Sequence, residues 1–296
     1  NITDSPANTV NNITAIQVTL NAVTGIGATG LNGAIETSAN LINATNTASG
    51  GIYLNSLLGA PAVNFNSILA QGTGDIELTA DNQAVLTVVN ASSGNVTGVS
   101  AGQMTVATAV TAGGTGDVSL TTTTGGIVLN GTTTAIGDDV TMTSAVGITG
   151  NGLVTANTFT GLANAGTIGV SAGNRVQTAV NLIRMNATGS IFTNNVSPSL
   201  TTYSLLAPAG VGINSGASID LITSNDLTIA NGARVTAVGS VSLQGGAGNT
   251  GATITLNDTV DGAGTPLVLG GGGNDDVIVN DMSSATPIDL NAQAGD

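Results

Sequence analysis

The sequence lacks the side chains on which most enzyme chemistry depends. It contains no Cys, His, Trp or Lys, and its only basic residues are Arg175, Arg184 and Arg234. Without Cys there is neither a disulfide nor a thiolate nucleophile. Without His or Lys the common general bases are missing, and the many Ser and Thr hydroxyls have no His to activate them. We therefore expect no catalytic residue and a protein that is not an enzyme.

Charge is scarce and almost entirely negative. Only 7% of residues are charged, whereas an ordinary globular domain has roughly 25%. The net charge is −14. Nucleic-acid binding relies on many Lys and Arg contacts to phosphates, so nucleic acid is excluded as a partner. No uncharged apolar run reaches the length of about 18 residues that spans a bilayer, so we expect no membrane insertion.

Aromatic residues and proline are also rare. Aromatics make up 2% of the chain and there are only 6 Pro, whereas hydrophobic residues reach 41%. A chain with this much Val, Ile and Leu can bury a core, which argues against disorder. That core has to be built from small aliphatic side chains instead of large aromatic ones. A narrow aliphatic core suits a repeat protein, in which each unit packs only on its neighbours.

Short motifs recur along the chain at a nearly constant step of roughly 21 residues, a period typical of solenoids. One clear pair of copies is TGDIELTA (73–80) and TGDVSLTT (115–122), which lie two steps apart. Another is TPLVLGGGGND (265–275) and TPIDLNAQAGD (286–296), which lie one step apart. The repetition indicates that one structural unit is stacked many times.

Apolar and polar residues alternate within each copy. In the first copy Ile76 and Leu78 share one face, and Glu77 lies on the other. Such alternation, bounded by Gly, Asn and Asp, predicts short strands joined by turns. The segment NRVQTAVNLIRM (174–185) also fits the spacing of a helix, and the alternative is one more strand. A β-sandwich has strands at similar spacing, but its strands are not copies of one another.

The sequence therefore predicts an all-β fold, a parallel β-helix or β-solenoid with about 21 residues per coil. We expect residues 1–296 to form one continuous segment of it, with stacked Thr and Asn in hydrogen-bonded ladders from coil to coil. No signal-peptide pattern is found at Asn1, and the last copy stops at Asp296 in mid-motif without a polar cap. We therefore expect the native polypeptide to be longer, or another subunit to stack at its end.

These motifs carry a family resemblance. The chain resembles the shaft repeats of filamentous-haemagglutinin-like and related giant surface adhesins of bacteria. The resemblance covers roughly residues 20–260 and rests on GGIYLN (50–55), TGDIELTA (73–80), GDVSLTTTTGGIVLNG (116–131) and GNGLVTANTFTG (150–161). It implies a right-handed parallel β-helix that is exported to the cell surface or the medium. It also implies a role in adhesion, biofilm or filament formation.

Four carboxylates recur at the starts of predicted strands, namely Asp75, Asp117, Asp138 and Asp139. Paired carboxylates hydrolyse glycosidic bonds in enzymes built on parallel β-helices, which is the functional interpretation. Asp after Gly also bonds nearby backbone amides in turns, which is the structural interpretation. Recurrence in several copies favours the structural role, because an active site is not repeated along a solenoid.

The arginines bear on the remaining enzyme class, the polysaccharide lyases of this fold. Those enzymes act on acidic sugars with clustered basic residues. Three Arg scattered between positions 175 and 234 fit that chemistry poorly. We expect Arg175 and Arg184 to pair with neighbouring Asp residues.

One segment matches the calcium-binding nonapeptide GGxGxDxUx. In GGGGNDDVI (270–278), Asp275 is the candidate ligand with Asp276 beside it, and Val277 is the inward apolar residue. Calcium needs several oxygen ligands, so successive turns have to share each ion. Only one full copy is present, and a plain Gly turn is the alternative. Residues 265–296 are thus where Gly- and Asp-rich calcium-type repeats would begin, and calcium is the one candidate cofactor.

Together these observations favour an extracellular structural protein, the stiff shaft of a bacterial surface adhesin or filament. We expect it to associate with itself or with neighbouring subunits in a fibre, and to touch glycans of a host or a biofilm. The alternative is a calcium-dependent or carbohydrate-binding solenoid module. A polysaccharide hydrolase or lyase is the third and least favoured interpretation.

Overall fold

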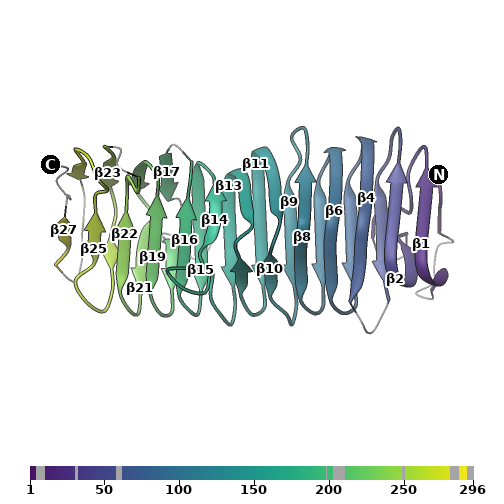
Figure 1. Ribbon diagram of the computed structural model, residues 1–296, viewed down its shortest axis with the longest axis horizontal. Helices are drawn as coiled ribbons and strands as arrows, with labels where there is room; N and C mark the ends of the chain where they lie inside the picture. Colours follow the sequence, from purple (N-terminus) through teal and green to yellow (C-terminus); the bar gives the residue numbers. More distant parts are fainter. Residues whose placement is uncertain are drawn as a thin grey trace. The chain divides into compact units, whose positions relative to one another are not determined.

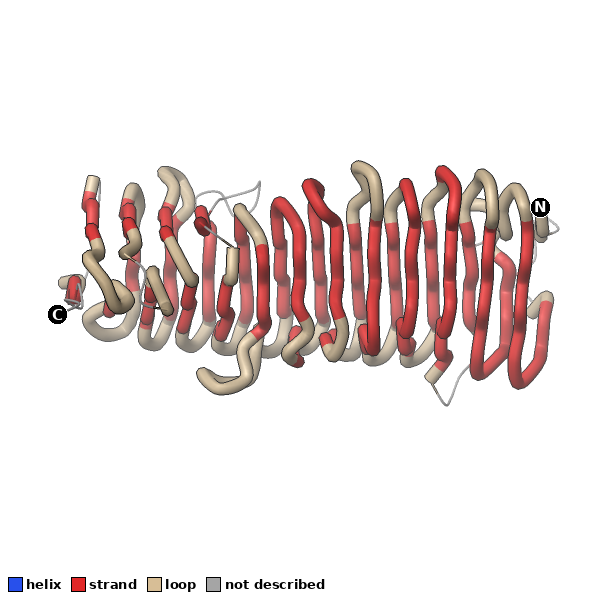
Figure 2. Tube along the Cα trace, turned by 45° about the horizontal axis from the view of Figure 1, so that its top comes forward, coloured by secondary structure: helices blue, strands red, loops and turns tan. Residues whose placement is uncertain are grey.

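The computed structural model describes residues 1–4, 11–30, 33–57, 62–197, 199–202, 211–248, 251–280 and 287–291. The chain divides into two compact units, Asn1–Ala145 and Val146–Asp296. All regular secondary structure in the described ranges is β-strand, with turns between the strands and no helix (Figure 2).

The first unit holds strands β1 to β11, drawn in purple to teal in Figure 1. Their bounds are β1 Ile13–Ala22, β2 Ile35–Asn46, β3 Ile52–Ser56, β4 Val63–Thr73, β5 Ile76–Ala80, β6 Ala84–Ser93, β7 Val96–Ser100, β8 Met104–Ala112, β9 Val118–Thr122, β10 Ile127–Leu129 and β11 Thr132–Ser144.

The second unit holds strands β12 to β27, drawn in teal through green to yellow. Their bounds are β12 Ile148–Gly150, β13 Leu153–Ala163, β14 Val176–Ala179, β15 Leu182–Ala187, β16 Ile191–Asn195, β17 Ser199–Thr202, β18 Val211–Ser215, β19 Ile219–Thr223, β20 Asp226–Ile229, β21 Arg234–Ala237, β22 Val241–Gln244, β23 Thr253–Leu256, β24 Val260–Asp261, β25 Leu267–Leu269, β26 Asp276–Val279 and β27 Asp289–Asn291.

Both units are parallel β-solenoids, with about 11 turns in all and roughly 23 residues per turn. Most strands pair in parallel with a strand about one turn later, as β5 does with β7 and β19 with β22. The turn is slightly longer than the step predicted from the sequence because loops of different length separate the strands. Paired residues are as close in sequence as Val176 and Thr193, 17 apart, and as distant as Asn186 and Asn214, 28 apart.

Inward-facing aliphatic residues stack in columns through each unit. Like residues stack because paired residues of in-register parallel strands point to the same side of the sheet. The column of unit 1 runs Ile2, Ile26, Ile52, Ile76, Val96, Val118, Val140. A matching column of unit 2 runs Ile148, Ile168, Ile191, Ile219, Val241. Apart from half-buried Ile2, these residues are buried, so each layer gains its stability from the layers beside it.

The two sequence copies around Ile76 and Val118 occupy equivalent places. Ile76 pairs with Val96, and Val96 pairs with Val118, so the copies lie two layers apart in one column. The predicted separation of two steps is therefore confirmed. In the neighbouring column Gly98 lies between Leu78 and Leu120, and the side chain of Leu120 fills the space beside it.

The structure decides two local expectations. The segment 174–185 forms strands β14 and β15, not a helix, because Val176 and Ile183 join the inward columns of the solenoid. The copies TPLVL and TPIDL pair one position away from the predicted register, with Leu267 against Asp289 instead of Ile288. In this register Val268, which pairs with Leu243 in the preceding layer, pairs with Leu290 in the next.

Candidate functional site

A ladder of side chains follows one edge of unit 1, where β5, β7 and β9 begin and β11 passes through. The Oδ1 atom of Asp75 accepts hydrogen bonds from the backbone N–H and the side-chain amide of Asn95, at 2.8 and 3.2 Å. Asn95 Oδ1 accepts from the backbone N–H of Asp117 at 2.9 Å, and Asp117 Oδ1 accepts from that of Asp139 at 3.1 Å. Each side chain therefore ties its own layer to the next one.

The ladder agrees with the structural interpretation of the recurring carboxylates. Asp75, Asp117 and Asp139 occupy equivalent places in their layers, and the first two bond backbone amides, as the structural interpretation requires. The bonds reach the following layer instead of the residue's own turn, which sequence reasoning did not foresee. Asn95, with no charge, takes the place of an Asp in the same ladder.

Asp138 adds a second carboxyl beside the ladder. A hydrogen bond with Asp117 raises the pKa of Asp138, and slight desolvation and the negative charges of Asp117 and Asp139 add to the rise. Within the described residues no group of three or more acidic, His or Cys side chains is arranged to hold a metal ion. Asp117, Asp138 and Asp139 therefore form an acidic patch on the surface of unit 1.

Polar ladders also cover other positions of both units. The expected Asn and Thr ladders are present, with side-chain hydrogen bonds of 2.7–3.2 Å between neighbouring layers. The pairs are Asn43 with Asn66, Asn64 with Thr87, Asn157 with Asn181, Gln177 with Asn194, Asn186 with Asn214, Asn214 with Thr236, and Asn257 with Asn280.

The predicted calcium ligands lie near the last described strands of unit 2. Asp275 Oδ1 accepts a hydrogen bond from the backbone N–H of Ala252 at 2.8 Å, and its side chain folds against Gly270. Asp276 is exposed at the start of β26, and Val277 stacks on Ile254 as the inward residue of the motif. The half-copy at 294–296 lies outside the described residues. Calcium at Asp275 and Asp276 stays a prediction.

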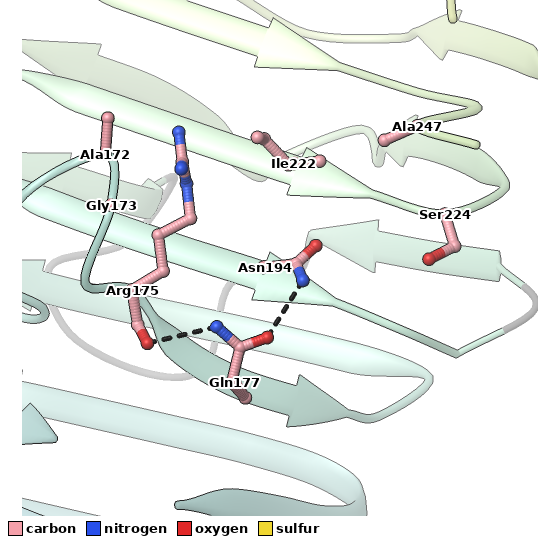
Figure 3. A pocket seen from close by; sticks show the side chains of 8 residues that line it. All are labelled: Ala172, Gly173, Arg175, Gln177, Asn194, Ile222, Ser224 and Ala247. Carbon is pink, nitrogen blue, oxygen red and sulfur yellow. Dashed lines mark hydrogen bonds between the residues drawn. The ribbon is translucent and has the colours of Figure 1, made fainter. Parts of the chain in front are cut away.

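A pocket of about 300 Å³ opens on the outer face of unit 2 (Figure 3). It lies over β14, β16 and β19, where Gln177, Asn194 and Ile222 stack in register. Asn194 Nδ2 donates to Gln177 Oε1 at 2.8 Å, and Gln177 Nε2 donates to the carbonyl of Arg175 at 3.1 Å. Residues of turns and bends complete the lining, namely Ala172, Gly173, Ser224 and Ala247.

The arginine of this pocket is paired with an acid from another layer. The Arg175 guanidinium forms a salt bridge with Asp220, and the two side chains are 15% and 22% exposed. The expected pairing of Arg175 with an Asp is thus present, although that Asp lies 45 residues away. The Nε–H of Arg175 is buried and has no acceptor within the described part of the chain. The lining of the pocket is therefore nearly neutral, because the charge of Arg175 is paired with that of Asp220. It contains one N–H donor without an acceptor, the Nε–H of Arg175.

The pocket is the feature that sequence reasoning missed. Its polar residues come from three layers, and no motif joins Gln177, Asn194 and Ser224 along the chain. The only signal was Arg175 itself, as one of three basic residues.

The fold and these ladders define the chain as a parallel β-solenoid repeat protein. No protein-family model, no curated protein and no solved structure matches it. Across the described residues, no helix is long and apolar enough to cross a membrane.

Proposed function

We propose that this chain is a structural, extracellular solenoid, a shaft segment of a bacterial surface adhesin or filament. The proposal rests on one observation, that the polar side chains form hydrogen bonds between layers. Along the described faces Asp, Asn and Thr bond the next layer, as in the ladder from Asp75 to Asp139. Side chains engaged in this way stiffen a stack and are not available for chemistry. The resemblance to adhesin shaft repeats supports the same role and the export to the cell surface.

The mechanism is mechanical. Layers that share columns of buried Ile and Val, and ladders between them, resist local opening because one layer cannot leave without exposing its neighbours. Such a shaft holds a distal binding site or a neighbouring subunit away from the cell. Contacts to host or biofilm glycans would be weak individually and would gain strength by repetition. The proposal includes no catalytic residue.

Self-association is part of this proposal, and strand β1 supports it. Among the described residues β1 pairs only with β2, so its other edge offers free backbone groups over ten residues. Ile16 in the middle of β1 is 83% exposed. Unpaired edges of this kind add strands from other chains readily. A second copy, or another part of a longer polypeptide, would complete the sheet there.

Electron microscopy of the purified chain at increasing concentration tests the proposal. We expect thin rods that lengthen into fibres, and light scattering should show a mass that rises with concentration. Ile16→Lys should reduce this association, because it places a charge on the open edge. Val238→Lys is the matched control, since Val238 is 71% exposed but belongs to unit 2. Compact particles that stay monomeric at every concentration would reject the shaft and its self-association.

The pocket over β14, β16 and β19 favours one second candidate, a carbohydrate-binding module. Gln177, Asn194 and the unmet Nε–H of Arg175 offer the amide and guanidinium groups that bind sugar hydroxyls. Binding of neutral and acidic oligosaccharides can be measured by calorimetry. Asn194→Ala should abolish binding, whereas Asn64→Ala, which removes a ladder amide from unit 1, should leave it unchanged. Equal binding by both variants would remove the pocket from consideration.

A further inference from the structure

A buried carboxylate lies near the start of unit 1. Glu36 on β2 is 0% exposed, and Asn55 on β3, its partner in the register, is 7% exposed. Because paired residues of parallel strands point to the same side, the two side chains lie next to each other on the outer face of the coil. Asp4, which precedes β1 in the chain, lies against Glu36.

Asn12 fixes that arrangement. Its Nδ2 donates to Asp4 Oδ1 at 2.8 Å, and its Oδ1 accepts from the backbone N–H of Glu36 at 2.7 Å. The backbone N–H of Asn12 also donates to the carbonyl of Glu36 at 3.0 Å. These contacts hold Asp4 beside Glu36, and Asn12 donates no hydrogen bond to the Glu36 carboxylate.

The oxygens that meet here are acceptors without donors. Glu36 Oε1 and Oε2 and Asn55 Oδ1 are buried, and none receives a hydrogen bond from an amide or hydroxyl of the described residues. A buried ionised carboxylate without compensation is very costly. Burial raises the pKa of Glu36, and the charge and hydrogen bonding of Asp4 raise it further. The site therefore needs a positive charge, either a proton or a cation.

No side chain of the same unit can supply that charge. The chain has neither Lys nor His, and Arg175 is the first of its three arginines, so unit 1 contains no basic side chain. The N-terminal ammonium of Asn1 donates to Thr24 Oγ1 at 3.2 Å, so a proton or a cation from solution is the remaining source of compensation. Two carboxylates and an amide carbonyl form an all-oxygen set, which hard cations prefer.

We propose that Asp4, Glu36 and Asn55 form a binding site for Ca²⁺. Ca²⁺ suits this site better than Mg²⁺ because it accepts irregular arrangements of six to eight oxygens, whereas Mg²⁺ requires a near-ideal octahedron and gives up its water reluctantly. Water completes the coordination. The ion joins Asp4 to the second and third layers, to which Glu36 and Asn55 belong. This site is separate from the motif at Asp275 and does not depend on the shaft function.

The test uses the whole chain freed of metal. Tyr53 lies two residues before Asn55, on the same face of β3, and the chain has no Trp. Tb³⁺ replaces Ca²⁺ and emits when a nearby tyrosine is excited. Because Tyr53 pairs with Glu77 on its other side, emission that Glu36→Gln abolishes reports on this site, and emission that persists in Glu36→Gln reports on another one. Calorimetric titration with CaCl₂ measures binding directly. Glu36→Gln keeps the size of the side chain and removes its charge, and Asp275→Asn with Asp276→Asn is the matched control.

We expect the wild-type chain to bind Ca²⁺ and to show Tb³⁺ emission that CaCl₂ displaces. Glu36→Gln should lose both, while the Asp275/Asp276 double variant keeps both. Tyr53→Phe should lose the emission but keep the calorimetric binding. Glu36→Gln is expected to fold, since it removes a buried charge, and its far-ultraviolet circular dichroism verifies this. The proposal is overturned if the wild-type chain binds no Ca²⁺, or if Glu36→Gln binds Ca²⁺ as the wild type does.

Discussion

Asn95 Oδ1 accepts a hydrogen bond from the backbone N–H of Asp117, which lies one layer further along unit 1. The two residues are 22 positions apart in the sequence, yet each occupies the residue just before an inward-facing Val. The contact shows how the solenoid uses its polar edge. The side-chain oxygen of Asn95 accepts a backbone hydrogen bond one residue before β7 and β9 begin to pair.

Replacing Asn95 tests the contribution of that ladder. Asn95→Ala removes the acceptor for Asp117 and the amide donor to Asp75. Because Asn95 is exposed and water can replace its partners, we expect a loss of about 1 kcal/mol in the free energy of unfolding. Urea denaturation followed by circular dichroism measures it. Asn130→Ala, at another exposed Asn of unit 1, should change stability by less than about 0.5 kcal/mol. Equal effects of both substitutions would show that the ladder does not stabilise the stack.

The inward columns are expected to carry far more of the stability. Leu120 is fully buried, and its neighbour in the preceding layer is Gly98, which has no side chain to fill a cavity. Leu120→Ala should therefore cost about 4–5 kcal/mol, near the upper end for such substitutions. Thr121→Ala on the same strand, at a half-exposed position, is the control and should cost less than about 1 kcal/mol. A small loss for Leu120→Ala would mean that the layers move together to close the gap.

Close contact between layers restricts some positions to glycine. A Cβ atom on Gly72 would lie 1.2 Å from the carbonyl oxygen of Ala48 in the preceding layer. Gly72→Ala has to push two backbones apart, and we expect it to destabilise unit 1 by about 1–3 kcal/mol. Gly264→Ala meets nothing within 4 Å and should be neutral or slightly stabilising, by up to about 1 kcal/mol. Thermal unfolding distinguishes the two. Tolerance of Ala at position 72 would contradict the observed layer contact.

Alkaline pH should destabilise the protein through Tyr53. Burial raises the pKa of Tyr53 above its ordinary value of 10.0, and the charges of Asp75 and Glu77 add to the rise. Ionisation is thus harder in the folded than in the unfolded chain. The stabilisation this provides is complete below pH 10 and disappears as the pH rises through the folded-state pKa.

The composition simplifies the measurement of stability at alkaline pH. Without Lys, His or Cys, the two tyrosines are the only side chains that titrate between about pH 8 and 12. Unfolding curves of the wild type should therefore weaken above pH 10, and Tyr53→Phe should reduce that dependence. An unchanged alkaline loss in Tyr53→Phe would assign it to another group.

The buried residues could be predicted from the sequence, because the alternation of apolar and polar residues shows which face of a strand each residue occupies. Ile76, Val118 and Val140 were identifiable as inward residues of copied strands, and the structure stacks them. The candidate sites were harder to predict from the sequence. Asp275 was found through a motif, whereas nothing in the sequence brings Glu36 next to Asn55 or Arg175 next to Asp220. Those pairs depend on loop lengths, which vary from layer to layer.

By itself, the sequence determined the class of fold. Aliphatic alternation bounded by Gly, Asn and Asp, repeated at a nearly constant step, leaves stacked parallel strands as the arrangement that buries most of the Ile and Val residues with so few aromatics. Only the tertiary structure decided which layers meet, because the varying offsets between paired strands follow from how the loops pack and not from local propensity. It also decided that Glu36 is buried, because Asp4 and Asn12, which are distant from it in the sequence, lie against it in the fold.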